Sequence, residues 1–173
     1  MTPKKKALFL DRDGVINDDV AYPHKPEHIA FKPGIFDLCK KAIDKGYCLV
    51  VVTNQAGVAK GYFTEEDVRG LHAWMKEKFF EQGIAIAGFY YCPFHKNGTV
   101  EKYRVDSDCR KPKPGMVLQA AGELDIDIAR SIIVGDKASD RVELPGLRCI
   151  ILKSMYTPTG YDVEELRDVE GYL

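Results

Sequence analysis

The chain alternates short apolar runs with longer stretches in which apolar side chains recur every three or four positions. Each short run is bounded by charged or turn-forming residues, which is typical of strands that are buried on both faces of a sheet. The predicted strands are residues 7–10, 48–52, 84–91, 131–134 and 148–152.

The stretches between these runs have the spacing of amphipathic helices, whose apolar side chains fall on one face. Thr64 is expected to cap one of them, because Asp67 follows at the third helical position and can complete a capping box. Gly46 and Gly83 stand where two of these helices should end. Helices are predicted over residues 35–43, from Thr64 to Gly83 and over 116–124, with a short helix near 163–167.

Strands that alternate with helices predict an α/β fold, here a three-layer, doubly wound, Rossmann-like sheet that is mostly parallel. We expect one domain over residues 1–173, because no repeat or linker-like segment divides the chain. Its core should cover about residues 6–152, followed by a C-terminal tail at 153–173. The connection at 92–114 is longer than most loops and is expected to be either functional or held together by a metal. No insertion is large enough for a separate cap domain.

Composition and charge narrow the possible functions. Of the 173 residues, 45% are hydrophobic and 29% are charged, which is ordinary for a globular protein. The net charge of −1 offers no field that would attract nucleic acid or an anionic membrane, and no stretch has the length of a membrane span. The five cysteines are an odd number, which favours reduced thiols over a disulfide framework. We expect a cytoplasmic protein, monomeric and without nucleic-acid or membrane partners.

Polar side chains directly follow three of the predicted strands. Asp11 and Asp13 follow the first strand, Thr53 follows the second and Asp136 follows the fourth. The carboxyl ends of parallel strands meet at one edge of a sheet, so these side chains should converge. Carboxylates so close together repel one another unless a cation lies between them, which predicts a divalent metal site, with Mg²⁺ as the expected ion. For the first pair alone, the alternative is a solvated Asp-Gly turn.

Four motifs in this order resemble those of the haloacid dehalogenase superfamily of phosphatases. They read DRDGVIN at residues 11–17, TNQAGVAKG at 53–61, CRKPKPGM at 109–116 and GDK at 135–137. Together they are similar to the D,D-heptose 1,7-bisphosphate phosphatases and to the related histidinol-phosphate phosphatases. The resemblance implies a sheet of the haloacid dehalogenase type.

The resemblance also implies a mechanism through an aspartyl-phosphate. Asp11 would be the nucleophile, since a carboxylate is a competent nucleophile once nearby cations screen its charge. Asp13 would be the general acid, which later deprotonates water. Mg²⁺ would be bound by Asp11, by Asp136 and by the main-chain carbonyls of Asp13 and Lys137.

Further residues would bind the substrate if the resemblance holds. Thr53 and Lys111 would contact the phosphoryl group as catalytic residues, and Arg110 would bind a distal group by bidentate recognition. Asp19 and Tyr22 would contact sugar hydroxyls, although the family's Asp-His-Gly-Tyr is Asp-Val-Ala-Tyr in this chain. The expected substrate-binding residues are Asp19, Tyr22, Thr53, Asn54, Gln55, Arg110, Lys111 and Lys137.

The relatives carry a structural zinc in the long third loop, and this chain departs from their ligand pattern. Cys92 and Cys109 are in place, but Phe94 and Ser107 stand where two further ligands are expected. Structural zinc sites use four ligands, so we expect the site to be lost. A disulfide between the cysteines is disfavoured in a cytoplasmic protein. The other alternative is a site rebuilt from both cysteines, His95 and either Asp106 or Asp108.

These features predict a Mg²⁺-dependent phosphatase that removes one phosphate from a heptose bisphosphate, a phosphorylated sugar used in making lipopolysaccharide or other surface glycans. The nearest alternative is a histidinol-phosphate phosphatase, but Arg110 favours the bisphosphate because it could bind a second phosphate. A receiver-type signalling domain would carry its phosphorylated aspartate after the third strand, where this chain has Tyr91-Cys92-Pro93. A DNA 3′-phosphatase is disfavoured by the near-neutral charge.

Overall fold

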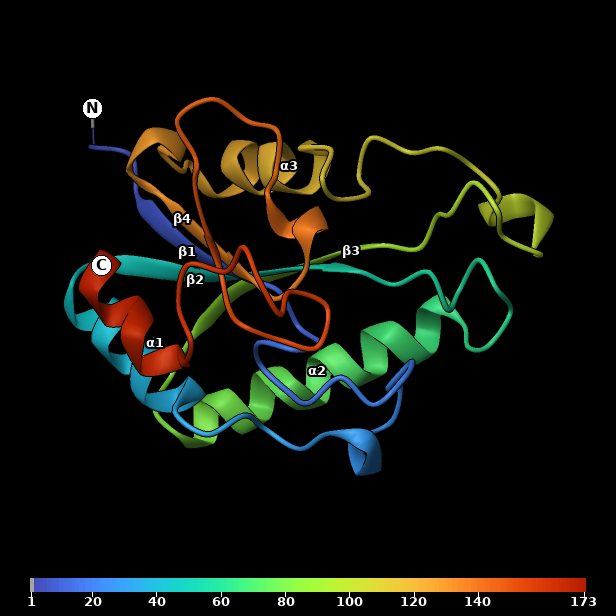
Figure 1. Cartoon of the computed structure of the whole chain (residues 1–173), viewed down its shortest axis with the longest axis horizontal. Helices are drawn as coiled ribbons and strands as arrows, with labels where there is room; N and C mark the ends of the chain where they lie inside the picture. Colours follow the sequence, from blue (N-terminus) through green and yellow to red (C-terminus); the bar gives the residue numbers. More distant parts are fainter. Residues whose placement is uncertain (1) are drawn as a thin grey trace.

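A parallel sheet of five strands forms the centre of the computed structural model, which describes residues 2–173 (Figure 1). β1 (Lys6–Leu10) lies in the middle, between β2 (Tyr47–Asn54) and β4 (Ile132–Gly135). β3 (Ile86–Cys92) and β5 (Arg148–Ile151) form the two edges, and every pair of neighbours is parallel. The five predicted strands are confirmed, apart from small shifts at their ends.

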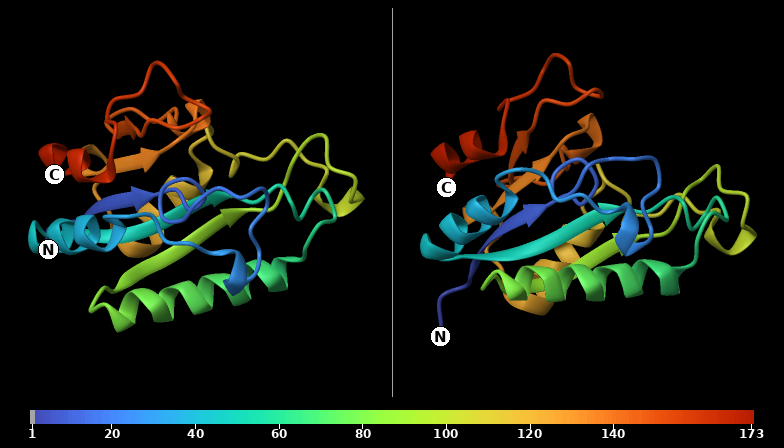
Figure 2. Two further views of the ribbon diagram at one scale, coloured as in Figure 1. Left: turned by 60° about the horizontal axis from the view of Figure 1, so that its bottom comes forward. Right: turned by 90° about the horizontal axis from the view of Figure 1, so that it is seen from below.

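Helices cover both faces of this sheet, which gives three layers (Figures 1 and 2). α1 (Ile35–Asp44) and α2 (Glu65–Glu81) lie on one face, and α3 (Gly115–Leu124) lies on the other. The alternation of side chains along each strand divides the core accordingly. Leu8 of β1 packs in the core that α1 and α2 share, whereas Phe9 packs in the core beneath α3. The doubly wound α/β fold is therefore confirmed.

The second helix, α2, begins with the cap that the sequence predicts. The Thr64 hydroxyl accepts a hydrogen bond from the main-chain N–H of Asp67 at 3.2 Å, and the Asp67 carboxylate accepts one from the main-chain N–H of Thr64 at 2.8 Å. The buried side chains of this helix include Met75 and Phe79, which lie in the same core as α1. No helix within residues 2–173 is both long and apolar enough to cross a bilayer.

The C-terminal segment folds back onto the face of the sheet that α1 covers (Figure 2). Leu166 and Val169 are buried in that core, while Val163 pairs with Leu152 in an isolated parallel bridge. The short helix expected near residues 163–167 is instead a 3₁₀ helix over Leu166–Tyr172. The prediction placed it too early because the bridge keeps Val163 extended.

The strand order β3-β2-β1-β4-β5 determines where a ligand can bind. The chain continues to one side of β1 through β2 and β3 and to the other side through β4 and β5, so a crevice forms outside the carboxyl ends of β1 and β4. The loops that follow the first four strands all emerge at this edge (Figure 2). Receiver domains have the order 2-1-3-4-5, so the topology does not fit the receiver alternative.

Candidate active site

The loop after β1 brings its carboxylates close to the end of β4, and a glycine makes this approach possible. Asp11 immediately follows β1, and its main-chain N–H donates a hydrogen bond to the carbonyl of Val134 at 3.0 Å. Gly14 has a φ of +94°, and a Cβ atom at this position would lie 2.1 Å from Oδ2 of Asp136. A residue with a side chain would therefore push the two loops apart.

Three buried acids meet at this edge: Asp11, Asp136 and Asp140. Each offers a carboxylate oxygen, and the three oxygens lie within 4.8 Å of one another. Asp140 is the site residue that the sequence analysis missed, although it lies only four positions after Asp136. Gly135 leaves room for it, because a Cβ atom on that glycine would lie 2.0 Å from Cβ of Asp140. The signal that could have revealed it is the pattern of Gly135, Asp136 and a second acid four positions later.

Lys111 lies among these acids and is only 3% exposed. Its Nζ donates hydrogen bonds to Oδ1 of Asp11 at 3.0 Å, to Oδ1 of Asp140 and to the main-chain carbonyl of Val52 at 2.9 Å. Burial alone would favour the neutral amine, but the charges of Asp11 and Asp140 outweigh it, so the pKa of Lys111 is raised. The predicted catalytic lysine is thus a buried cation beside the predicted nucleophile.

The electrostatics of the acids fit a divalent cation. Burial, followed by the neighbouring Asp140 carboxylate, raises the pKa of Asp11 to about 8, and burial raises the pKa of Asp136 to about 6. Within residues 2–173, Oδ1 of Asp136 is buried without a hydrogen-bond partner. Oδ1 of Asp140 is bound to Lys111, and its Oδ2 accepts from the main-chain N–H groups of Asp136 and Lys137. Asp11 and Asp136 therefore fit the metal, whereas Asp140 positions its neighbours.

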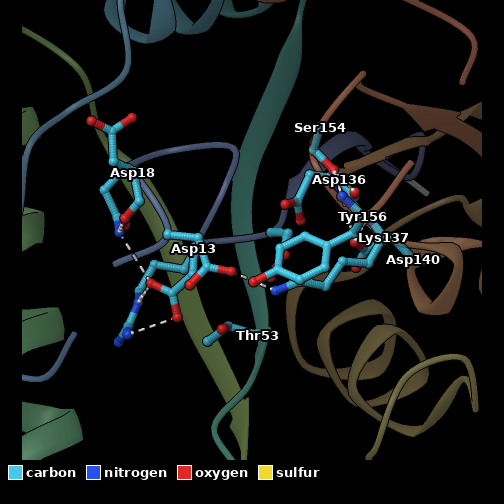
Figure 3. A network of polar contacts seen from close by, with 12 residues as sticks. Asp13, Asp18, Thr53, Asp136, Lys137, Asp140, Ser154 and Tyr156 are labelled. Atoms are coloured by element: carbon cyan, nitrogen blue, oxygen red, sulfur yellow. Dashed lines mark hydrogen bonds and ion pairs between the residues drawn. The ribbon is translucent and has the colours of Figure 1, made fainter. Parts of the chain in front are cut away.

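Asp13 does not belong to this group of acids, because other side chains hold its carboxylate (Figure 3). Arg12 donates from Nε to Oδ1 at 2.9 Å and from Nη2 to Oδ2 at 3.0 Å. Asn17 and Gln55 donate one further hydrogen bond each, both at 3.1 Å. These contacts fix the orientation of Asp13 at the mouth of the site. Binding of Mg²⁺ by the main-chain carbonyl of Asp13 stays a prediction.

Arg12 is a buried part of the site that the sequence analysis did not identify. Its side chain is fully buried, and Nη2 also donates to the main-chain carbonyl of Pro23 at 2.7 Å. Nη1 of Arg12 lies 3.2 Å from Nε2 of His72 on α2. Burial, with the Arg12 charge adding to it, lowers the pKa of His72 to about 3, so this histidine is neutral and can accept from Arg12. His72 is a buried packing residue of α2 that supports Arg12.

The motif that begins in the last residues of β2 supports the site from a second side. The Gln55 side chain donates to Oγ1 of Thr53 at 2.8 Å. Asn54 holds the backbone of Lys111: its Oδ1 accepts from the Lys111 N–H at 3.0 Å, and its Nδ2 donates to the Lys111 carbonyl at 3.2 Å. Substrate binding by Asn54 stays a prediction, and the structure shows that Asn54 positions the loop that carries Lys111.

Two adjoining cavities open above these residues. The inner cavity has a volume of about 40 Å³, and the outer cavity has a volume of about 350 Å³. Both are lined by Asp13, Asn54, Lys137 and Ser139, which therefore mark the junction. The inner cavity is also lined by Asp11, Thr53, Lys111 and Asp140.

The outer cavity is polar and contains the remaining predicted substrate residues. Nζ of Lys137 pairs with Oδ2 of Asp19 at 2.8 Å, and the Tyr22 hydroxyl accepts a hydrogen bond from Lys60. Nη1 of Arg110 is buried and has no hydrogen-bond partner in the described part of the chain. The structure therefore brings every predicted site residue to one place. The cavity is also lined by side chains that the sequence analysis did not name as site residues, among them Lys60, Ser139 and Tyr156. His95, which was considered there only as a zinc ligand, lines it as well.

The loop that carries Arg110 is joined to the end of β3 by a disulfide between Cys92 and Cys109. The sequence analysis disfavoured this pairing, and that expectation was wrong. The cysteines can pair because β3 ends at Cys92 and the returning loop places the two Cα atoms 5.5 Å apart. His95 is engaged elsewhere, since its Nδ1 accepts from the Asn97 N–H at 3.1 Å. The loss of zinc binding stays a prediction.

Comparisons with known proteins agree with this arrangement. A model of the family described as polynucleotide kinase 3 phosphatase matches residues 12–161. The chain is 43% identical to a D-glycero-beta-D-manno-heptose-1,7-bisphosphate 7-phosphatase of Vibrio cholerae, over 98% of this chain and 96% of that protein. It is 48% identical to a D-glycero-alpha-D-manno-heptose-1,7-bisphosphate 7-phosphatase of Burkholderia mallei, over 79% of this chain and 72% of that protein.

A solved structure supports the same relationship. The D,D-heptose 1,7-bisphosphate phosphatase from B. bronchiseptica, complexed with magnesium and phosphate, matches this chain with a TM-score of 0.80 and 25% sequence identity. The match covers 96% of this chain and 97% of that one.

Proposed function

This chain belongs to the haloacid dehalogenase superfamily, in the family of the heptose 1,7-bisphosphate 7-phosphatases, and we propose that it hydrolyses the 7-phosphate of such a sugar. The observation that carries the proposal is the inner cavity, where Asp11, Thr53 and Lys111 surround a space beside a larger polar cavity. A phosphoryl group would enter the first space while the sugar remains in the second.

The side chains of this cavity account for both steps of a phosphate ester hydrolysis. The Asp11 carboxylate would attack phosphorus and form an aspartyl-phosphate, while Asp13 gives a proton to the leaving sugar oxygen. Asp13 would then take a proton from the water that attacks the same phosphorus, which releases inorganic phosphate and restores Asp11. Lys111, already within 3.0 Å of Asp11, would stabilise the charge on the phosphoryl oxygens.

The acids that follow β1 and β4 support a requirement for Mg²⁺. Asp11 and Asp136 would bind the ion, with the main-chain carbonyls of Asp13 and Lys137 as the further expected ligands. The bound ion would neutralise charge on the phosphoryl oxygens as a Lewis acid. Two observations support this assignment. Oδ1 of Asp136 is a buried acceptor without a donor within residues 2–173, and the pKa of Asp11 is raised by burial and then by the neighbouring Asp140 carboxylate.

The charges of the outer cavity favour a substrate with a second phosphate. Its cations are Lys60, Arg110 and Lys137, against the two acids Asp13 and Asp19. Asp13 and Asp19 are already paired with other groups, whereas Nη1 of Arg110 is buried and without a partner within residues 2–173. A distal phosphate would satisfy this guanidinium by bidentate hydrogen bonding. The amine of histidinol phosphate would meet these cations instead, which disfavours that alternative.

A phosphate-release assay tests the proposal. The panel comprises both anomers of heptose 1,7-bisphosphate, histidinol phosphate and an oligodeoxynucleotide with a 3′-phosphate, with Asp11→Asn as the inactive control. We expect the highest kcat/KM for one heptose bisphosphate anomer and the release of one phosphate per molecule. Faster hydrolysis of histidinol phosphate or of the oligonucleotide would overturn the sugar assignment, and a fully active Asp11→Asn protein would overturn the mechanism.

A further inference from the structure

Tyr156 lines the outer cavity, although it lies in the C-terminal segment and outside the four motifs of the active site. Its side chain is 50% exposed. The neighbouring Met155 is 82% exposed and does not line the cavity. Of these two adjacent apolar side chains, only the tyrosine therefore faces the place where a substrate would lie.

The turn that carries Tyr156 is attached to the end of β4. The Ser154 hydroxyl donates a hydrogen bond to the main-chain carbonyl of Asp136 at 2.6 Å, and the Thr157 hydroxyl donates to the same carbonyl at 3.2 Å. The main-chain N–H of Tyr156 donates to Oγ of Ser154 at 3.1 Å. Figure 3 shows Ser154 next to Asp136. The position of Tyr156 is thus fixed relative to Asp136, one of the three buried acids that meet beside the inner cavity.

Tyr156 also contacts Lys137, one of the four residues at the junction of the two cavities. Nζ of Lys137 lies 4.5 Å from the centre of the Tyr156 ring, and the same ammonium group pairs with Asp19 at 2.8 Å (Figure 3). The negative charge of Asp19 raises the pKa of Tyr156, so its hydroxyl stays protonated and able to donate. Lys137 is thereby held between an aromatic face and a carboxylate, at the boundary between the two cavities.

We propose that Tyr156 is a specificity-determining residue that contacts the sugar portion of the substrate. The proposal rests on the proposed function, since that function puts the sugar in the outer cavity. A tyrosine suits a polyhydroxylated chain because its ring packs against C–H groups while its hydroxyl donates to an oxygen. It would orient the sugar so that the reacting phosphate reaches Asp11.

The test compares two phosphorylated substrates that share the reacting phosphoryl group and differ in the rest of the molecule. One is the heptose bisphosphate, and the other is acetyl phosphate, whose acetyl group is too small to fill the outer cavity. The variants are Tyr156→Ala and Tyr156→Phe, with Met155→Ala as the matched control. We expect Tyr156→Ala to raise KM for the heptose bisphosphate about tenfold, a typical effect of one lost contact, with a smaller change in kcat.

The ratio of kcat/KM for the sugar to that for acetyl phosphate decides the outcome. It should fall about tenfold in Tyr156→Ala, fall less in Tyr156→Phe and stay constant in Met155→Ala. An unchanged ratio would overturn the proposal. If both kcat/KM values fell equally, Tyr156 would act only through Lys137 on the inner cavity, and if neither fell, Tyr156 would make no contact that matters. If the unmodified protein prefers another ester, the proposed function fails, and the ratio is then measured with that ester.

Discussion

The balance between negative and positive charges around Lys111 explains the electrostatics of the site. Three buried carboxylates, those of Asp11, Asp136 and Asp140, share one buried ammonium group. With all groups ionised, three negative charges face one positive charge, so two negative charges remain unbalanced. Burial makes such an excess costly, which is why the pKa values of Asp11 and Asp136 are raised. A divalent cation would supply the missing charge.

Asp140 should matter for activity although it would not touch the substrate. In Asp140→Asn, Lys111 loses a charged partner. The single amide oxygen could then accept either from Lys111 or from the main-chain N–H groups of Asp136 and Lys137, but not from both. Since removing such supporting groups typically costs about 10–100-fold, we expect kcat/KM to fall by that factor. Asp108→Asn is the control, because this acid is exposed, and it should keep full activity. Unchanged kinetics in Asp140→Asn would contradict the positioning role.

Gly14 is a second residue where the structure makes a sharp prediction. Gly14→Ala combines a positive φ with a Cβ atom 2.1 Å from Asp136, so we expect a loss of about 1–3 kcal/mol in unfolding free energy. The control is Gly122→Ala in α3, where nothing lies within 4 Å of the added atom. It should stabilise the helix by about 0.5–1 kcal/mol. Urea unfolding measures both, and equal stabilities would refute the steric argument.

Among the elements, the start of α2 depends on side-chain capping rather than on packing alone. The reciprocal hydrogen bonds of Thr64 and Asp67 satisfy two main-chain donors that the helix leaves free. Thr64→Ala should lower the unfolding free energy by about 1 kcal/mol, whereas Thr64→Ser keeps the hydroxyl and should be close to the unmodified protein. Thermal and urea unfolding of the pair check this, and equal losses in both variants would count against the cap.

The loop after β3 is the element in which the cysteine pair acts. The disulfide closes a loop with a sequence separation of 17 residues, which by chain entropy corresponds to about 3 kcal/mol of stability. A reducing agent should therefore lower the unfolding free energy by about that amount in the unmodified protein. The Cys92→Ser variant should not respond to the reducing agent. Stoichiometric zinc in protein purified without added metal would contradict the disulfide and restore the zinc interpretation.

For the whole molecule, the buried acids link stability to pH and to the metal. A carboxyl group whose pKa is higher in the folded state binds more protons when folded, so stability falls as pH rises from its unfolded value towards the folded one. For Asp11 this interval runs from 3.8 to about 8. In metal-free protein, the melting temperature of Asp11→Asn relative to the unmodified chain should therefore increase from pH 5 to pH 8.

Added Mg²⁺ should act in the opposite direction. It stabilises the ionised carboxylates of the folded state, so its effect on the melting temperature should be larger at pH 8 than at pH 5. The Asp11→Asn variant should show a smaller effect at both values. A Mg²⁺ effect that is independent of pH in the unmodified protein would contradict the charge balance described above.

The sequence alone determined the strands and the residues that follow them. A strand buried on both faces must be a continuous apolar run, so its end is visible as the first polar residue, and a parallel sheet brings such ends to one edge. Asp11, Thr53 and Asp136 could therefore be predicted. Within each apolar run, successive side chains point to opposite faces of the sheet, so the run also predicts which of the two cores each side chain enters.

Only the tertiary structure decided which residues from distant parts of the chain contact the site. Asp140 matters because Lys111 reaches it from 29 positions away, and Arg12 because Gln55 and His72 surround it. Tyr156 reaches the cavity because the last segment folds back over the end of β4. Local patterns describe how a residue relates to its neighbours along the chain, whereas these contacts depend on how distant segments pack.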